Sequence, residues 1–328
     1  MQQEAGASAQ PSPKAVGRQR RVISSPHLHR LQRRHFALFD VLPALGSVAA
    51  FATLPWLPPS GLSLLVCALL WLATGLGLTV GFHRLFAHRA FATGPRVAVG
   101  LMILGSMAAR GSGFSWAAMH RRHHEHADRS GDPHSPNMVR SGRFPRLRGF
   151  LHAHLTWMVR HDYPNVGHYI PDLMRDGRLA AANRRYYHWV ALGLAIPVVI
   201  GGLSRPGLGG MLSGLLWGGA VRMFLVEQTM SSINSLMHLF GARPFATAGD
   251  QSRNLGCLAL ASWGEGWHNN HHAFPNSAAF GLGWRQPDPG LWAIRALAAM
   301  GLAWDVRTPT PERIAARRAL SPQGADSD

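Results

Sequence analysis

Long apolar blocks alternate with strongly polar stretches along this chain. Crossing the hydrocarbon core of a bilayer takes roughly 20 apolar residues in a helix. Four blocks have about that length, and they lie at about residues 36–57, 62–82, 187–203 and 208–226. Two short turns that contain Pro and Gly, at residues 57–61 and 204–207, join the blocks in pairs. The pattern therefore predicts two helical hairpins that span a membrane.

A fifth apolar run, at residues 97–109, has only 13 residues. It is too short to cross the bilayer, so we expect an interfacial or buried helix there. This interpretation decides the topology, because a crossing at this point would put the histidines before it and those after it on opposite faces of the membrane. If the run does not cross, all of them lie on one face.

Polar segments bound the apolar region at both ends. Residues 1–25 are rich in Gln, Ala, Ser, Pro and Arg, lack apolar periodicity, and are expected to form a disordered basic tail. Residues 26–307 are expected to form one membrane domain, and residues 308–328 a short helix with a polar tail. The predicted fold is therefore an all-α integral membrane protein, with four transmembrane helices in two hairpins and a cytoplasmic helical cap.

The distribution of charge predicts the orientation. The chain has 33 Lys and Arg against 16 Asp and Glu, which gives a formal net charge of +17. Arginines gather before the first apolar block and between the hairpins, whereas the outer turns contain only Arg205. Because basic residues favour cytoplasmic loops, we expect both termini and the central loop to be cytoplasmic, and no nucleic acid partner. Arg222 lies in the fourth apolar helix near its cytoplasmic end, so its side chain is expected to snorkel to the membrane surface.

Histidines carry the clearest chemical signal. The residues of an HxxHH box at i, i+3 and i+4 share one face of a helix, so each box is expected to direct three imidazoles at one point and to supply half of a metal site. His83 and His88 are five residues apart, about 140° around a regular α-helix, so they need a frayed helix end or a metal between them. Nine of the 19 histidines fall in such boxes or end the fourth helix: His83, His88, His120, His123, His124, His238, His268, His271 and His272.

Nine imidazoles are too many for one metal with four to six ligands, so we expect two metals in the cap. Imidazole binds iron, copper, zinc and nickel alike, so the ligand type leaves the metal open. A carboxylate di-iron bundle would need two Glu-x-x-His motifs, and Glu265 with His268 is the only one in the sequence. We therefore expect Glu265, and Asp132 after the second box, to orient imidazoles.

The position of the histidines also indicates a substrate. A metal pair at the end of lipid-spanning helices suits a molecule that is part apolar and part polar, such as an acyl chain on a charged carrier. An unactivated methylene group has no acidic proton, so acid–base residues alone cannot break its C–H bond, and we expect oxygen activated on a redox metal. This reasoning favours iron over zinc.

The boxes HRLFAH, HRRHH and EGWHNNHHAFP, with GDPHSP and NSLMHLFG between them, resemble those of membrane-bound acyl desaturases of the stearoyl-CoA desaturase type, over about residues 36–306. The resemblance implies that the nine histidines bind two irons and that Asn234 holds a water on one iron. It also implies that a cis double bond enters a saturated acyl chain at the delta-9 position while dioxygen is reduced to water. Two electrons would come from a separate protein of the ferredoxin, rubredoxin or cytochrome b5 type.

The sequence leaves the acyl carrier and the final product open. The resemblance places Arg160 near the phosphates of the carrier. Animal acyl-CoA desaturases have an Arg-Asp pair just before the second box, whereas this chain has Ala118 and Met119. Acyl-CoA, acyl carrier protein and glycerolipid are therefore all candidate carriers. The alternative functions are a hydroxylase or second-desaturation enzyme on the same scaffold, and a metal-handling membrane protein.

Overall fold

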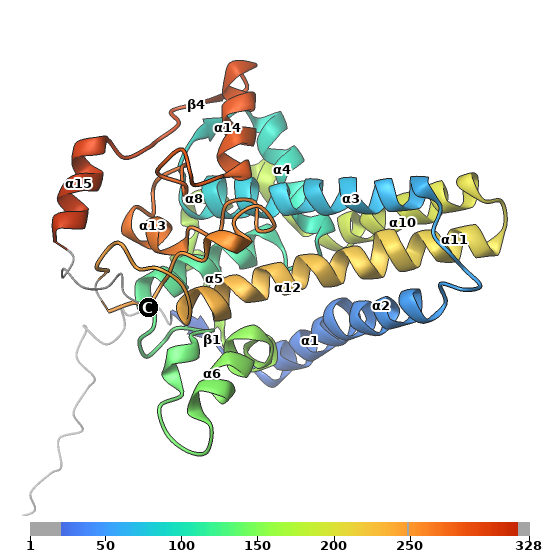
Figure 1. The fold of residues 1–328 in the computed structure, drawn as a ribbon, viewed down its shortest axis with the longest axis horizontal. Helices are drawn as coiled ribbons and strands as arrows, with labels where there is room; N and C mark the ends of the chain where they lie inside the picture. The colour runs from blue at the N-terminus through green and yellow to red at the C-terminus, as the bar shows by residue number, and fades with distance from the viewer. Residues whose placement is uncertain (1–20, 248, 321–328) are drawn as a thin grey trace, which may run out of the picture.

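The structure is a computed structural model that describes residues 21–247 and 249–320. Residues 1–20 of the expected N-terminal tail and residues 321–328 of the expected C-terminal tail lie outside the described part. Long helices run side by side through one half of the molecule, and shorter helices and loops form a cap on the other half (Figure 1).

In the described part of the chain, four helices are long and apolar enough to cross a membrane, by their length and composition: Pro26–Ala52, Gly61–Ala87, Tyr186–Ser204 and Leu208–His238. The last three contain the predicted apolar blocks, whereas the first overlaps its block and ends five residues before the predicted end at residue 57. The first begins earlier than predicted, because Ser25 caps its N-terminus by accepting a hydrogen bond from the backbone N–H of Leu28 at 3.2 Å, and Pro26 suits the first turn. The fourth continues well beyond its apolar block and ends at His238.

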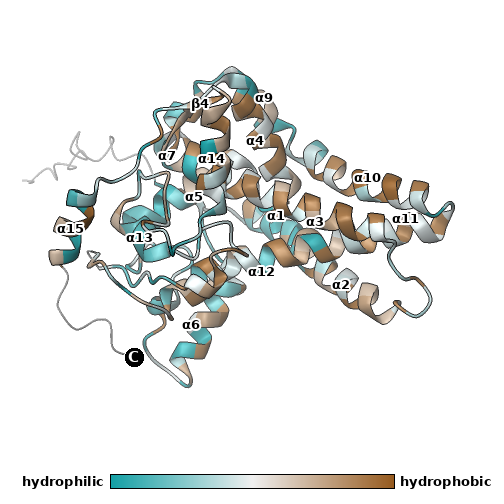
Figure 2. Ribbon diagram, turned by 45° about the horizontal axis from the view of Figure 1, so that its top comes forward, coloured by the Kyte–Doolittle hydropathy of each residue, from teal (hydrophilic) through white to brown (hydrophobic). Residues whose placement is uncertain are grey.

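Three of the four long helices change their winding along their length. The first is α1 (Pro26–Phe36), the π-helical segment Ala37–Val41 and α2 (Leu42–Ala52); the second is α3 (Gly61–Leu76) and the π-helical segment Gly77–Ala87; the third is α10 (Tyr186–Ser204); the fourth is α11 (Leu208–Gly214), the π-helical segment Leu215–Val221, α12 (Arg222–Ser235) and the 3-10 turn Leu236–His238. Apolar residues, coloured brown in Figure 2, are prominent along α2, α3, α10 and α11, whereas hydrophilic residues gather on the cap.

The second hairpin depends on close backbone contact between α10 and the fourth long helix. A Cβ atom on Gly214 would lie 2.0 Å from the carbonyl oxygen of Pro197, and one on Gly201 would lie 2.4 Å from the carbonyl oxygen of Gly210. No side chain fits at these distances. Small residues are the usual means by which membrane helices approach one another closely.

The short helix α4 (Pro95–Met107) has 13 residues, too few to cross a bilayer, as the sequence predicts. It packs against the π-helical segment Gly77–Ala87, α3 and α10. Arg222 is fully buried and donates hydrogen bonds to the carbonyl oxygens of Met107, at 2.9 Å, and Gly218, at 2.8 Å. The expectation that Arg222 snorkels is therefore wrong, because its guanidinium satisfies a free carbonyl at the C-terminus of α4.

The cap consists of short helices tied together by two small antiparallel sheets. Strand β1 (Val22–Ile23) pairs with β3 (Tyr163–Pro164), and β2 (Ala92–Thr93) pairs with β4 (Ala303–Trp304). The second pair joins the segment after α14 to the segment after the second long helix. The helices of the cap are α5 (Gly113–His126), α6 (Pro145–His154), α7 (Val166–Tyr169), α8 (Pro171–Met174), α9 (Gly177–Arg184), α13 (His268–Ala273), α14 (Pro289–Ala299) and α15 (Pro311–Ala319), with 3-10 turns at Pro136–Met138, Thr156–Val159 and Gly256–Leu258.

The close contact in the second hairpin can be tested with one methyl group. We expect Gly214→Ala to lower the free energy of unfolding by about 1–3 kcal/mol, because the added Cβ must push the backbone of Pro197 away. The measurement is thermal unfolding of the protein in detergent. Gly209→Ala is the matched control on the same helix, since its Cβ would meet only Leu57 Cδ1, at 3.5 Å. Equal stability of the two variants would contradict the tight contact.

Candidate metal centre

His83 and His88 reach the same point because the helix that carries them is not a regular α-helix. The segment Gly77–Ala87 is π-helical, and the backbone N–H of His88 bonds to the carbonyl oxygen of His83, five residues earlier, at 3.1 Å. In this wider winding residue i+5 returns to the face of residue i. The two imidazole rings therefore lie 5.1 Å apart between centroids, and neither a frayed helix end nor a bound metal is needed to align them.

The second box lies in the last two turns of α5, and its histidines point in two directions. His120 and His124 are one turn apart, with ring centroids 4.6 Å apart. His123 turns instead toward His238 and His272, at centroid distances of 5.4 and 5.3 Å. The reason is helical geometry, because residue i+3 lies about 100° around the axis from residue i+4.

The third box forms α13, which buried asparagines hold in place. The side chain of Asn269 accepts from the backbone N–H of Phe245 at 2.9 Å and donates to the carbonyl oxygen of the same residue at 3.0 Å. Asn270 donates to the carbonyl oxygen of Phe280 at 2.8 Å. These bonds fix the helix so that His268 and His272 share one direction, with centroids 4.5 Å apart, while His271 takes the other.

The nine histidines form two clusters, within each of which the nitrogen atoms that could bind a metal lie within 4.8 Å of one another. Each HxxHH box contributes to both clusters, so the expectation that one box supplies one half of the site is wrong. The five-histidine cluster contains His83, His88, His120, His124 and His271, and the four-histidine cluster contains His123, His238, His268 and His272.

The spacing of the ring nitrogens fits a metal. In the five-histidine cluster, Nε2 of His271 lies 3.0 Å from Nε2 of His83 and 2.9 Å from Nε2 of His124. In the four-histidine cluster, Nε2 of His268 lies 3.0 Å from Nε2 of His238 and 3.1 Å from Nε2 of His272. A metal about 2.1 Å from each nitrogen, with ligands at right angles, would place neighbouring nitrogens about 3.0 Å apart. Nitrogens that converge at these distances form a suitable ligand set for one ion per cluster.

Burial keeps most of these imidazoles in the form that binds metal. Burial, and then the proximity of other histidines, holds the pKa of His88, His120 and His271 well below the usual range. The same two causes act on His124 and His268. Metal binding requires the neutral imidazole, so no proton has to be displaced from these five rings at neutral pH.

Carboxylates contact the Nδ1 atoms of four of the nine histidines, whose Nε2 atoms lie on the other side of the ring. Oε2 of Glu265 lies 2.7 Å from Nδ1 of His83, and Oδ1 of Asp132 lies 3.0 Å from Nδ1 of His123. Thr79 also donates a hydrogen bond to Glu265. The structure thus puts both carboxylates where the sequence predicts them, against imidazoles, and such contacts fix the orientation of a ligating ring.

Two further carboxylates contact histidines of the clusters, and the sequence did not predict them. Oδ2 of Asp128 lies 2.8 Å from Nδ1 of His238, and Oδ2 of Asp250 lies 3.4 Å from Nδ1 of His272. Burial alone would raise the pKa of the Asp128 carboxyl, but the adjacent His238 holds that pKa well below its usual range. Asp128 follows the second box closely, which is a weak sequence signal, whereas Asp250 lies far from any box and offers none.

His134 is a tenth histidine beside the clusters. Its ring lies 4.4 Å from that of His123, with the planes 30° apart, and it is fully buried within the GDPHSP segment. Asp132 lies close to both rings, but its side chain already bonds His123 and the backbone N–H of His134, at 3.1 Å. We therefore treat Asp132 as a residue that orients its neighbours.

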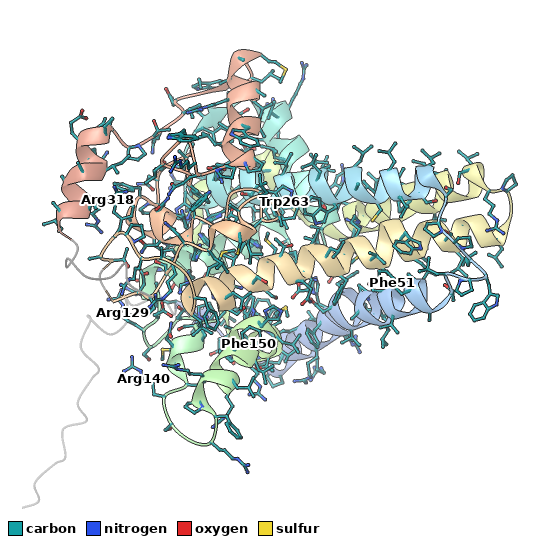
Figure 3. All side chains as sticks on the ribbon, in the orientation of Figure 1. Phe51, Arg129, Arg140, Phe150, Trp263 and Arg318 are labelled. Carbon is teal, nitrogen blue, oxygen red and sulfur yellow. The ribbon has the colours of Figure 1, made fainter. Side chains whose placement is uncertain are left out.

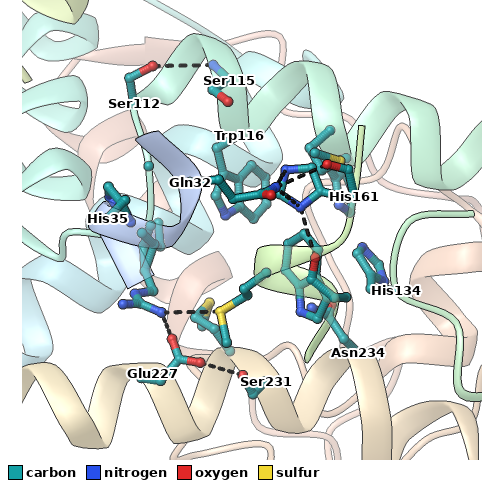
Figure 4. Close-up of a pocket in the computed structure, with 18 of the residues that line it drawn as sticks. Gln32, His35, Ser112, Ser115, Trp116, His134, His161, Glu227, Ser231 and Asn234 are labelled. Carbon is teal, nitrogen blue, oxygen red and sulfur yellow. Dashed lines mark hydrogen bonds and ion pairs between the residues drawn. The ribbon is translucent and has the colours of Figure 1, made fainter. Parts of the chain in front are cut away.

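A cavity of about 470 Å³ opens beside both clusters (Figure 4). His83 and His120 of the five-histidine cluster border it, as do His123 and His268 of the four-histidine cluster. Asn234, one turn before His238, also lines the cavity. Arg160 is exposed and is not among the residues that line it.

The wall of the cavity has both apolar and polar parts. Leu78, Trp116 and Met230 offer apolar surface near the histidines. Charged residues also line the cavity, and among them Arg110 contacts Asp40, at 2.6 Å, and Glu227. A ligand that is apolar at one end and polar at the other fits such a cavity.

Comparison with known proteins identifies the family. The profile of the fatty acid desaturase family matches residues 55–304. The chain belongs to this family. Like other members, it is an enzyme that desaturates fatty acyl chains.

Named relatives differ in the carrier of the acyl chain. A hex-5-enoyl-[acyl-carrier protein] acetylenase of Moorena producens (strain JHB) is 47% identical over 300 residues, which cover 91% of this chain and 93% of that protein. An sn-1 stearoyl-lipid 9-desaturase of Anabaena variabilis is 34% identical over 274 residues, 83% and 89% of the two chains. An icosanoyl-CoA 5-desaturase of Limnanthes douglasii is 34% identical over 249 residues, 74% and 64% of the two chains.

The contact between Asp128 and His238 generates a prediction for this desaturase. We expect Asp128→Asn to weaken divalent metal binding at the four-histidine cluster about 10–100-fold, because the ring of His238 loses its charged partner. Metal titration of the purified protein measures the change. Asp176→Asn is the control, since Asp176 caps α9 and Asn serves equally well in that role. Unchanged affinity in Asp128→Asn would contradict the orienting role.

Proposed function

We propose that this desaturase uses two irons and dioxygen to insert a cis double bond into a saturated fatty acyl chain, at the delta-9 position. The observation that best supports the proposal is the pair of buried histidine clusters on one cavity, in a member of the fatty acid desaturase family. All nine histidines predicted as ligands are in these two clusters.

Bound irons would supply activated oxygen, the oxidant that an unactivated methylene group requires. The five-histidine and four-histidine clusters would each hold one ion, with Asn234 placed on the cavity wall to hold a water. Glu265, Asp132, Asp128 and Asp250 would keep the imidazoles in the orientation that binds metal. The apolar part of the cavity wall would bind the methylene chain and keep water away from it.

The carrier, the electron donor and the orientation belong to the same proposal. The relatives named above act on chains held by acyl carrier protein, lipid or CoA, and the polar wall of the cavity suits the head of any of the three. We propose Arg160 as an exposed contact for the carrier. We also propose that the cap and both termini are cytoplasmic, where a ferredoxin, rubredoxin or cytochrome b5-type donor supplies two electrons.

A second desaturation, which converts an alkene into an alkyne, is the second candidate reaction. The observation that favours it is the 47% identity with a protein named as an acetylenase, over nearly the full length of both chains. The two reactions need the same oxidant and the same cavity. They differ only in whether the bound chain already carries a double bond.

The metal content tests the proposed cofactor. We expect freshly purified protein to contain about two irons per chain, and His120→Ala and His271→Ala to form no unsaturated product, since each removes a nitrogen from the five-histidine cluster. Elemental analysis and product assays measure both effects. His188→Ala, at an exposed position on α10, is the control and should keep full iron content. Active protein with stoichiometric zinc and no iron would contradict the proposal.

The product tests the proposed reaction. The enzyme is expressed in a host that lacks its own desaturase, and total lipids and acyl thioesters are analysed by mass spectrometry with localisation of the unsaturation. We expect a cis alkene at carbon nine, counted from the carbonyl. An alkyne would select the second candidate, and a hydroxylated chain would contradict both.

A further inference from the structure

The space on the membrane side of the metal centre lies between the second and fourth long helices. On the second, Gly75 lies eight residues before His83 on the same continuous helix. On the fourth, Met230 and Val226 precede His238 in the same direction. A long acyl chain that extended past the clusters along these two helices would need space between them.

Trp263 occupies this space. It comes from the loop just before Glu265 and is 1% exposed, and Figure 3 shows it where the cap meets α3. Its indole lies against Gly75, where an added Cβ would be only 2.0 Å from ring atoms Cε2 and Cζ2. Its ring centroid also lies 4.7 Å from that of Trp71 on α3.

The cavity does not continue past this indole. Leu78 and Met230 line the cavity on the membrane side, and both also belong to the packed apolar cluster that contains Trp263 and Val226. Trp263 and Trp71 are not among the lining residues. Because protein interiors are closely packed, a methylene chain could extend past Leu78 and Met230 into this cluster only by displacing its side chains, and Trp263 is the largest of those that are fully buried.

Trp263 is held at some energetic cost. Its backbone has a φ of +53°, which is unfavourable for a residue other than glycine. Its indole N–H is buried and has no hydrogen-bond partner among the described residues, although a Leu or Phe would fill space without that penalty. Breaches of such local rules concentrate at functional positions.

We infer that Trp263 limits the length of acyl chain that can extend beyond the oxidised carbons, so that this enzyme takes medium-length chains of about 12–14 carbons and oxidises them close to the methyl end. The inference rests on the proposed function, because it concerns the substrate of the same cavity. Trp263 is thus a residue that determines specificity and takes no part in the chemistry.

Substitution of Trp263 tests the inference through chain-length preference. Iron-loaded wild-type enzyme and the variants Trp263→Leu and Trp263→Ala receive a series of acyl groups, from dodecanoyl to stearoyl, on one carrier. We expect the wild type to prefer the short members, and Trp263→Ala to raise the ratio of kcat/KM for long over short chains by at least about tenfold, with Trp263→Leu in between. Trp217→Ala is the control, since Trp217 is a buried indole in a separate cluster with Ala50 and Val221.

Iron content and thermal unfolding identify variants that fail to fold, and Trp263→Leu keeps the test valid if Trp263→Ala is one of them. A folded, iron-loaded variant with the wild-type ranking of chain lengths overturns the inference, as does an equal change in Trp217→Ala. If the wild type oxidises no chain, the proposed function is wrong. Equilibrium binding of the same acyl series to wild type and variants then tests Trp263 alone, with tighter binding of long chains expected only in the Trp263 variants.

Discussion

The structure depends on the convergence of nine imidazoles in one buried volume. Protonated imidazoles would repel one another there, and burial prevents this by lowering the pKa of rings such as His120 and His271. Four carboxylates contact the outward nitrogens of the histidines and leave the inward nitrogens facing one another. The ends of the second and fourth long helices must therefore meet α5 and α13 at one place. This requirement determines how the cap is built.

Changes in helical winding allow the imidazoles to converge. The π-helical segment Gly77–Ala87 aligns His83 with His88, and it also brings Gly77 against α4, where a Cβ would lie 2.2 Å from the backbone nitrogen of Gly105. One departure from regular geometry thus positions two imidazoles and docks the short helix. Such segments are rare and are found mostly at functional sites.

A buried ion pair joins the first histidine box to the loop that follows the third histidine box. Arg84, within the HRLFAH box, is fully buried and donates to Asp288 at 2.8 Å and to the carbonyl oxygen of Ala278 at 3.0 Å. Asp288 also caps α14 by accepting from the backbone N–H of Leu291 at 3.0 Å. These contacts hold the segment that follows α13, while the carbonyl oxygen of Trp263 accepts from the backbone N–H of Gly290 at 2.9 Å. The loop that carries Trp263 is therefore held by the start of α14, which Asp288 caps and which the ion pair with Arg84 ties to the first box.

The sequence by itself determined the presence of four long helices, the short apolar run that forms α4, and the nine histidines that cluster. Apolar length and i, i+3, i+4 spacing are local properties, so they can be read along the chain. It also indicated Glu265 and Asp132. Only the tertiary structure decided that each HxxHH box serves both clusters, that Arg222 is buried, that Asp250 contacts His272, and that Trp263 packs against Gly75. Those outcomes depend on which segments pack together across long separations, and on a π-helical winding that no residue spacing reveals.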